Sequence, residues 1–164
     1  MQYLSRELLM AQIRNDCGVL IEYKLPATSR RVDFIITGHD AEDKPGFVII
    51  ELKQWSEAKA VRDKPVVVVA NISGHFVGET NHPSYQAWSY RMFLDNMLDN
   101  VQKYHLNSKA CACMHNYAYQ GPNKDDLAVS PNDNLVRATP IFGKHNGQEL
   151  GQFWAKLNVG NAKL

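Results

Sequence analysis

Two apolar segments rich in β-branched residues constrain the fold of this chain more than any other feature. Residues 30–38 read RRVDFIITG and residues 47–55 read FVIIELKQW, and both carry the Val, Ile and Phe side chains that favour β-strands. The intervening residues 39–46, HDAEDKPG, contain the Asp, Pro and Gly that favour turns. The sequence therefore predicts two strands that are joined by a short turn and pair as a hairpin.

Each of these predicted strands carries charged residues that a buried strand rarely contains. Asp33 lies between Val32 and Phe34 in the first strand, and Glu51 and Lys53 follow the apolar FVII run in the second. Because side chains alternate between the two faces of a strand, Glu51 and Lys53 point to the same side. If the two strands pair through the turn, Asp33 can lie beside Glu51.

The three charged side chains indicate a metal-dependent phosphate chemistry. Buried charges are costly unless they are paired or bound to a metal. A divalent cation resolves the repulsion between two neighbouring carboxylates, and oxygen ligands suit Mg²⁺ or Mn²⁺. Lys53 beside such an ion can position an attacking water and offset the negative charge that grows on a phosphate. The pattern therefore predicts phosphodiester hydrolysis with Asp33, Glu51 and Lys53 at the reacting centre.

Other segments continue the alternation of helix and strand. Residues 3–14 have the spacing of an amphipathic helix, and residues 19–26 and 65–70 have the composition of strands. A long helix is expected from Pro83, and residues 109–119 alternate as a strand does. An order of helix, three strands, an insertion, a helix and a strand predicts a mixed α/β layer arrangement.

The remaining segments carry weaker signals. Residues 56–64 are expected to form a short helical or irregular connection, and residues 72–83, with two glycines, a small hairpin or a loop. Residues 121–133 have the composition of a polar loop, and residues 148–157 that of a last helix.

Composition and length bound the class of protein. A chain of 164 residues fits one domain over 1–164, with a core over about 1–119 and a C-terminal extension over 120–164. The net charge of +1 excludes a wholly basic nucleic-acid binder, so contacts with nucleic acid require a local patch such as Arg30 and Arg31. Three cysteines, no apolar leader and no long apolar run predict a cytoplasmic protein outside the membrane.

The charged residues lie in a pattern that resembles a known nuclease motif. Asp33, followed after the predicted hairpin by the Glu-Leu-Lys of residues 51–53, looks like the D…(D/E)-x-K signature of the PD-(D/E)XK nuclease superfamily. Gln86 and Tyr90, four residues apart, resemble the Q-x-x-x-Y motif of its RecB-like members. The resemblance implies a restriction-endonuclease-like α/β core, in which helices flank a mixed central sheet in the order α-β-β-β-α-β.

This resemblance assigns the central roles. Asp33 and Glu51 would bind Mg²⁺ or Mn²⁺ with help from the Leu52 carbonyl, and Lys53 would orient or activate the attacking water. The family's motif usually has a hydrophobic residue and then a proline before the Asp. This chain departs from that form, because Val32 stands directly before Asp33. The superfamily tolerates loss of that proline.

Supporting roles follow from the same resemblance. Gln86 and Tyr90 would support the site or contact the nucleic-acid backbone. Related nucleases often add an acidic residue from the first helix, where Glu7 is the candidate, and Glu22 on the following strand is its rival.

The resemblance also implies partners. The amino-acid sequence of residues 30–55 and 82–90 is most similar to that of a nuclease domain that precedes a superfamily-one helicase in certain bacterial proteins. The chain has no GxxxxGK[ST] phosphate loop, so a helicase domain would belong to a longer protein. Nucleic acid, DNA favoured over RNA, is the expected partner, and a homodimer remains open because many such nucleases pair to cut both strands.

Simpler interpretations compete with these assignments. Lys53 and Glu51 can form a structural ion pair at a sheet edge, on a fold that binds nucleic acid or assembles without catalysis. Cys111, Cys113 and His115 share one face of a predicted strand and suggest zinc, but packing of small cysteines in the core is favoured, because no fourth ligand is evident.

Overall fold

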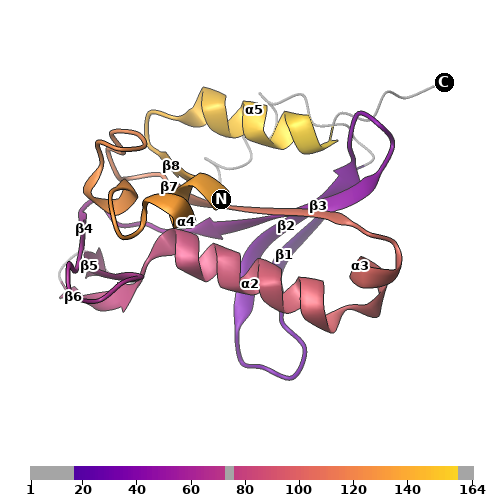
Figure 1. The fold of residues 1–164 in the computed structure, drawn as a ribbon, viewed down its shortest axis with the longest axis horizontal. Coiled ribbons are helices and arrows are strands. Elements are labelled where there is room, and N and C mark those ends of the chain that lie inside the picture. The colour runs from indigo at the N-terminus through magenta and orange to yellow at the C-terminus, as the bar shows by residue number, and fades with distance from the viewer. Residues whose placement is uncertain (1–16, 73–75, 159–164) are drawn as a thin grey trace. The chain divides into compact units, whose positions relative to one another are not determined.

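A computed structural model of the chain describes residues 17–72 and 76–158 (Figure 1). The expected helix at 3–14 and its Glu7 lie outside these residues. The described elements, in chain order, are β1 (Gly18–Lys24), β2 (Arg31–His39), β3 (Pro45–Leu52), β4 (Ala58–Ala60), β5 (Val67–Ile72), β6 (Phe76–Asn81), α2 (Pro83–Met97), α3 (Asp99–Lys103), β7 (Asn107–Met114), the 3₁₀ helix η1 (Asp126–Ala128), α4 (Asp133–Ala138), β8 (Ile141–Gly143) and α5 (Gly147–Asn158).

The described strands form two sheets. The larger sheet has the order β1-β2-β3-β7-β8, and the smaller sheet has the order β4-β5-β6. β1, β2 and β3 pair in antiparallel fashion, whereas β7 and β8 are parallel, so the central sheet is mixed. The register of β2 and β3 pairs Phe34 with Ile50 and His39 with Pro45, which confirms the predicted hairpin. The expectation of a mixed α/β fold whose central sheet is flanked by helices is also confirmed.

The chain divides into two compact units, which are described separately. Unit 1 comprises the described parts of Met1–Ile50, Tyr90–Lys109 and Gly147–Leu164. Unit 2 comprises the described parts of Glu51–Ser89 and Ala110–Asn146.

Unit 1 is built on the hairpin of β2 and β3. Three consecutive residues of β2, Phe34 to Ile36, are buried, so both faces of this part of the sheet are covered. α5 packs against β2 and buries Leu150 and Trp154. In Figure 1, α5 and the second half of α2 lie on opposite sides of the hairpin. Ser108 Oγ donates a hydrogen bond of 2.8 Å to Asp95 Oδ2, which ties α2 to the start of β7.

Unit 2 has its own apolar core beside the smaller sheet. One buried cluster draws on six segments of the chain and includes Trp55, Val68, Met114, Leu127 and Ile141. The three strands of the smaller sheet are antiparallel throughout. The same unit contains Glu51 at the end of β3 and Gln86 in the first half of α2.

Three segments differ from the expectations. Residues 56–64 contain β4, a strand that pairs with β5, instead of a helical or irregular connection. β3 ends at Leu52, three residues earlier than predicted, and β7 ends at Met114 rather than at residue 119. A three-residue strand such as β4 has no detectable period of its own, because it forms only through its neighbour.

Residues 121–158 form more regular structure than the sequence indicates. Residues 121–133, expected as a polar loop, contain η1, and β8 extends the central sheet. The predicted last helix is present as α5.

Candidate functional site

Glu51 is a buried carboxylate at the end of a buried strand. It is the penultimate residue of β3 and only 3% exposed, because the apolar run before it holds the strand in the protein interior. Its Oε1 accepts hydrogen bonds from Lys53 Nζ at 2.8 Å and from Gln86 Nε2 at 2.7 Å. A carboxylate removed from water in this way is tolerated because charge-assisted hydrogen bonds offset its lost hydration.

Lys53 follows β3 directly and shares its side with Glu51, as the two-residue spacing predicts. Its backbone N–H donates to the Cys113 carbonyl at 2.9 Å, which holds the residue against β7 after β3 has ended. The ammonium is largely buried, with a side-chain exposure of 15%. It lies 5.4 Å from the centroid of the Trp55 ring, in a cation–π arrangement.

Gln86, in the first half of α2, joins both members of this ion pair. Its Oε1 accepts from Lys53 Nζ at 2.9 Å while its Nε2 donates to Glu51. An amide can fill both roles because it carries an acceptor oxygen and a donor nitrogen. Glu51, Lys53 and Gln86 therefore close a ring of three hydrogen bonds, which we call the Glu-Lys-Gln ring, within unit 2.

His82 fixes the start of α2 and so the position of Gln86. Its Nδ1 accepts the Ser84 N–H at 3.2 Å, which assigns the proton to Nε2, 2.9 Å from the Leu127 carbonyl. Its backbone N–H donates to the Val66 carbonyl at 2.7 Å, and its carbonyl accepts the Gln86 N–H at 3.0 Å. The imidazole thus caps the helix in the way that Ser or Asp usually does.

The environment of His82 also sets its charge. Burial lowers the pKa of this imidazole below its usual value, against the opposing effects of the Leu127 carbonyl and the Asp125 carboxylate. Protonation would place a second N–H against the Ser84 N–H, so the neutral ring is the form that caps α2. No motif in the sequence points to His82. The signal that could have found it is a histidine directly before the Pro83 that begins the helix.

Asp33 and Tyr90 belong to unit 1. Asp33 lies in β2 and is partly buried. Tyr90 lies in α2, four residues after Gln86, and is 7% exposed. Tyr90 is therefore held in the interior of unit 1, whereas part of Asp33 is open to solvent.

The predicted basic residues lie at the exposed end of the β1–β2 hairpin. Arg30 and Arg31 are both exposed. Arg31 Nη1 lies 3.7 Å from Glu22 Oε2 in an ion pair whose side chains are more than 60% exposed, 64% and 69%. Such a pair contributes little to stability, so its partners remain able to exchange for a phosphate. Glu22 is a surface residue of unit 1 in this arrangement.

The geometry does not favour the zinc alternative. Cys111 and Cys113 are buried in β7, where small side chains fill the core. His115 directly follows the end of this strand. Within residues 17–72 and 76–158, no three His, Cys, Asp or Glu side chains are grouped in a way that could hold a metal ion.

No helix of the described residues combines the length and the apolar character needed to cross a membrane. Comparison with known proteins gave no match to any family model, to any curated protein or to any solved structure.

Proposed function

We propose that this chain is a metal-dependent phosphodiesterase that hydrolyses nucleic acid, DNA in preference to RNA, on a restriction-endonuclease-like core. The observation that carries the proposal is the Glu-Lys-Gln ring. It joins the charged residues of the E-x-K pattern to the glutamine of the Q-x-x-x-Y pattern, and Gln86 is 35 positions from Glu51 along the chain. Two independent sequence motifs thus supply one cluster of side chains.

The available donors fit a hard divalent cation. Glu51 offers a buried carboxylate, and the Leu52 carbonyl follows it on β3. Asp33, on β2, is the second carboxylate that the resemblance assigns to the ion. Two carboxylates and a carbonyl are all-oxygen ligands, which Mg²⁺ and Mn²⁺ prefer. A bound ion would supply Lewis acidity and a more acidic water.

Lys53 has the properties of a residue that stabilises the negative charge that develops on the phosphate during hydrolysis. In hydrolysis, a water oxygen adds to phosphorus, one P–O ester bond breaks, and the leaving oxygen takes up a proton. An ammonium has three N–H donors, and two of those of Lys53 serve Glu51 and Gln86. We assign one N–H of this ammonium to a phosphate oxygen or to the attacking water when substrate is bound. In a largely buried position this positive charge acts more strongly than it would in water.

Gln86 positions the other two members of the ring. Its amide holds the ammonium and the carboxylate at once, so it restricts the rotamers of two long side chains. Tyr90 supports α2 from the interior, and the exposed Arg30 and Arg31 contact phosphates of the bound strand. Glu7 stays a candidate for a further acidic group.

Cleavage assays on the wild-type protein test this function. Labelled single- and double-stranded DNA and RNA are incubated with Mg²⁺, with Mn²⁺, or with EDTA. We expect cleavage with either metal, none in EDTA, and faster cleavage of DNA than of RNA. Cleavage that is unaffected by EDTA would contradict the proposal.

A second candidate is a catalytically silent nucleic-acid-binding or assembly module on the same fold. The observation that favours it is that Glu51, Lys53 and Gln86 bind one another, as a purely structural ion pair would. A folded wild-type protein that binds nucleic acid but cleaves none of the four polymers would establish this candidate instead.

A further inference from the structure

Two cations face each other where β1 and β2 meet their connecting turn. The antiparallel register places Lys24 directly opposite Arg31, and both residues are exposed. Side chains that oppose each other on antiparallel strands have Cβ atoms about 5 Å apart, and like charges in this position are destabilising. The stability of the fold therefore does not explain why two positive charges stand at this pair of positions.

The surroundings of the pair offset little of this positive charge. Arg30 adds a third exposed cation, and Glu22 is the only acid in residues 22–32. Glu22 lies 3.7 Å from Arg31, and both side chains are largely exposed, so solvent screens the attraction between them. The β1–β2 turn (residues 25–30) and the strand ends beside it thus present an excess of positive charge to a negative ligand.

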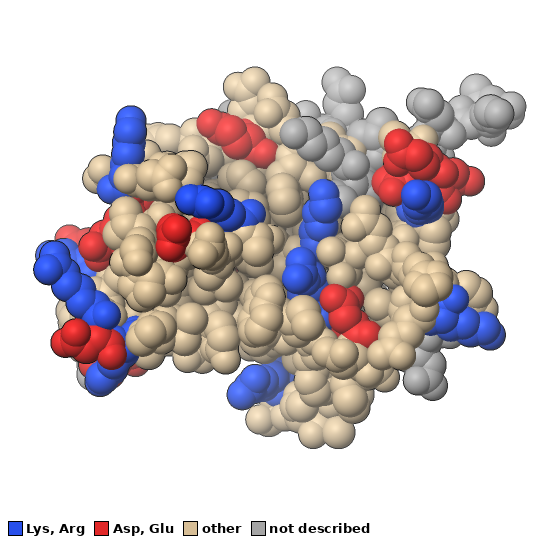
Figure 2. Space-filling model, in the orientation of Figure 1, with Lys and Arg blue, Asp and Glu red and all other residues tan. Residues whose placement is uncertain are grey.

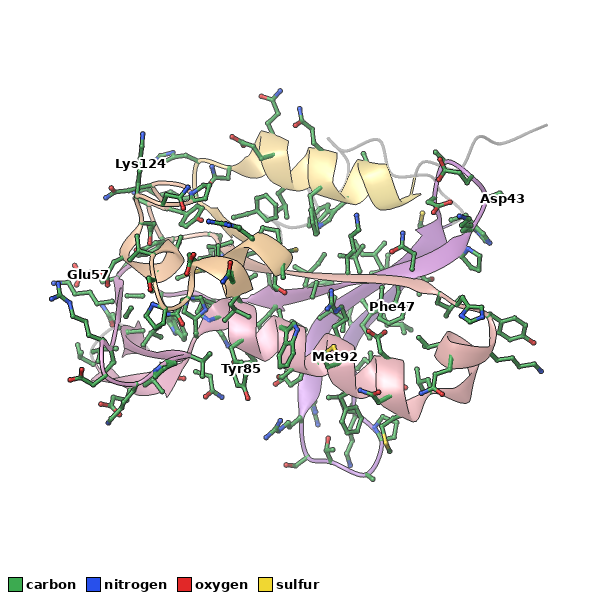
Figure 3. The ribbon with its side chains drawn as sticks, in the orientation of Figure 1. Asp43, Phe47, Glu57, Tyr85, Met92 and Lys124 are labelled. Carbon is green, nitrogen blue, oxygen red and sulfur yellow. The ribbon has the colours of Figure 1, made fainter. Side chains whose placement is uncertain are left out.

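The turn at the other end of β2 carries the opposite charge. The β2–β3 turn, residues 40–44, reads DAEDK and contains three acids and one lysine. In Figure 2, red surface lies over this turn at the upper right, and blue surface lies beside the β1–β2 turn at the bottom. Figure 3 shows Asp43 at the β2–β3 turn. A polyanion that approaches unit 1 is therefore attracted to one end of β2 and repelled by the other.

Hydrogen bonds within the β1–β2 turn hold its backbone in one conformation. The Leu25 N–H donates to the Arg30 carbonyl at 3.0 Å, and the Thr28 hydroxyl donates to the Leu25 carbonyl at 3.1 Å. Thr28 Oγ1 also accepts the Arg30 N–H at 3.1 Å. Leu25 is 1% exposed, so its side chain anchors the turn in the protein interior. Because the backbone is ordered before a ligand arrives, binding costs less conformational entropy.

We propose that Lys24 and Arg31 together bind one phosphate of a nucleic-acid backbone, and that Arg30 contacts a neighbouring phosphate. The inference rests on the proposed function in taking nucleic acid as the ligand, and it adds Lys24 and a defined anion site to it. A phosphate between two opposed cations replaces their repulsion by attraction to a shared anion. Residues 26–29, Pro-Ala-Thr-Ser, carry no large apolar side chain, which an anionic lipid surface would favour.

Urea unfolding without nucleic acid tests the repulsion between the two cations. Lys24→Gln keeps a long side chain but removes its charge, so the urea midpoint should rise at low salt. The rise should shrink at high salt, because ions screen exposed charges. The matched control is Lys44→Gln, at an exposed lysine of the acidic β2–β3 turn, and it should not raise the midpoint.

Anisotropy of a labelled DNA duplex in EDTA tests binding without cleavage. Affinity should fall about fivefold in Lys24→Gln, and the slope of log Kd against log salt should decrease by about 0.9, since one phosphate contact is lost. Glu22→Gln should instead raise the affinity, because it frees Arg31 from its acidic neighbour. Lys44→Gln should bind as the wild type does. Circular dichroism confirms that each variant is folded.

Wild-type affinity and salt slope in Lys24→Gln would overturn the phosphate site, as would a urea midpoint that falls at low salt. Binding to phosphatidylserine vesicles that exceeds binding to DNA and is lost in Lys24→Gln would also overturn it, in favour of a lipid surface. The two proposals fail separately. Binding that depends on Lys24 without any metal-dependent cleavage refutes the nuclease alone, whereas metal-dependent cleavage with unchanged affinity in Lys24→Gln refutes the phosphate site alone.

Discussion

Gln86 Nε2 donates a 2.7 Å hydrogen bond to Glu51 Oε1, although the two residues are 35 positions apart in the chain. Through this contact, α2 and the end of β3 hold one carboxylate between them, and Lys53 completes the ring. Because the proposed chemistry depends on this ring, its members are the first residues to change.

Replacing Gln86 by Ala should impair activity more than stability. The change removes two charge-assisted hydrogen bonds, so we expect the free energy of unfolding to fall by about 1–2 kcal/mol. Cleavage should slow by about tenfold or more, because Lys53 and Glu51 lose their shared positioning group. Urea unfolding and single-turnover cleavage measure the two effects. The control Gln102→Ala, at an exposed glutamine of α3, should change neither, and an equal effect in both variants would refute the role of Gln86.

Glu51 and Lys53 should be strongly coupled. Because both side chains are largely buried, each single change to Ala leaves an uncompensated charge and should cost about 3 kcal/mol of unfolding free energy. The double variant should lose less than the sum of the two. A double-mutant cycle by urea unfolding gives the coupling free energy. Additive losses would show that the pair does not interact as the 2.8 Å distance indicates.

Stability should fall in mild acid through His82. Burial lowers the pKa of this histidine in the folded protein, so below about pH 6.5 the unfolded chain binds a proton that the folded chain does not. The free energy of unfolding therefore decreases as the pH falls from 6.5 toward the lowered pKa. Urea unfolding at pH 7.5, 6.5 and 5.5 should show this slope.

A histidine variant tests whether His82 causes this pH dependence of the free energy of unfolding. His82→Gln should flatten it, whereas His145→Gln, at an exposed histidine of the same unit, should leave it unchanged. Partial burial also lowers the pKa of His115, so a smaller slope of the same sign should persist in the His82 variant. A slope identical to that of the wild type in His82→Gln would contradict the capping role.

Asp125 should be a stability residue of unit 2. It is 2% exposed, and its carboxylate accepts from the Tyr117 hydroxyl at 2.9 Å, the Gln120 N–H at 2.9 Å and the Leu127 N–H at 3.0 Å. Asp125→Ala leaves three donors without their acceptor and should lower the free energy of unfolding by about 3 kcal/mol. Asp63→Ala, at an exposed carboxylate, serves as the control in thermal unfolding.

Much of the fold could be predicted from the sequence because periodicity and composition agree there. The hairpin of residues 30–55 combines apolar strands with a turn of suitable residues, and α2 begins at Pro83 as expected. β4 could not be predicted, because a strand of three residues forms only through its pairing with β5. η1 was missed for a similar reason, since it depends on the Asp125 carboxylate and on burial of Leu127.

The candidate site was predictable in part. The spacing of Glu51 and Lys53 placed them on one side of a strand, and their 2.8 Å contact bears out that expectation. The direct bonds from Gln86 to both of them could not be derived from spacing, because they depend on how α2 packs beside β3 in three dimensions. The capping role of His82 could not be predicted, because a lone histidine gives no periodic signal in the sequence.

The most direct test of the central claim compares Lys53→Ala with Lys64→Ala in the cleavage of single-stranded DNA with Mg²⁺. Lys64 is an exposed lysine of the same unit, and it pairs with Glu79 away from the Glu-Lys-Gln ring. We expect that Lys53→Ala remains folded and binds the strand but loses at least a hundredfold in cleavage rate, while Lys64→Ala keeps wild-type activity. Undiminished cleavage by a folded Lys53→Ala protein would contradict the account.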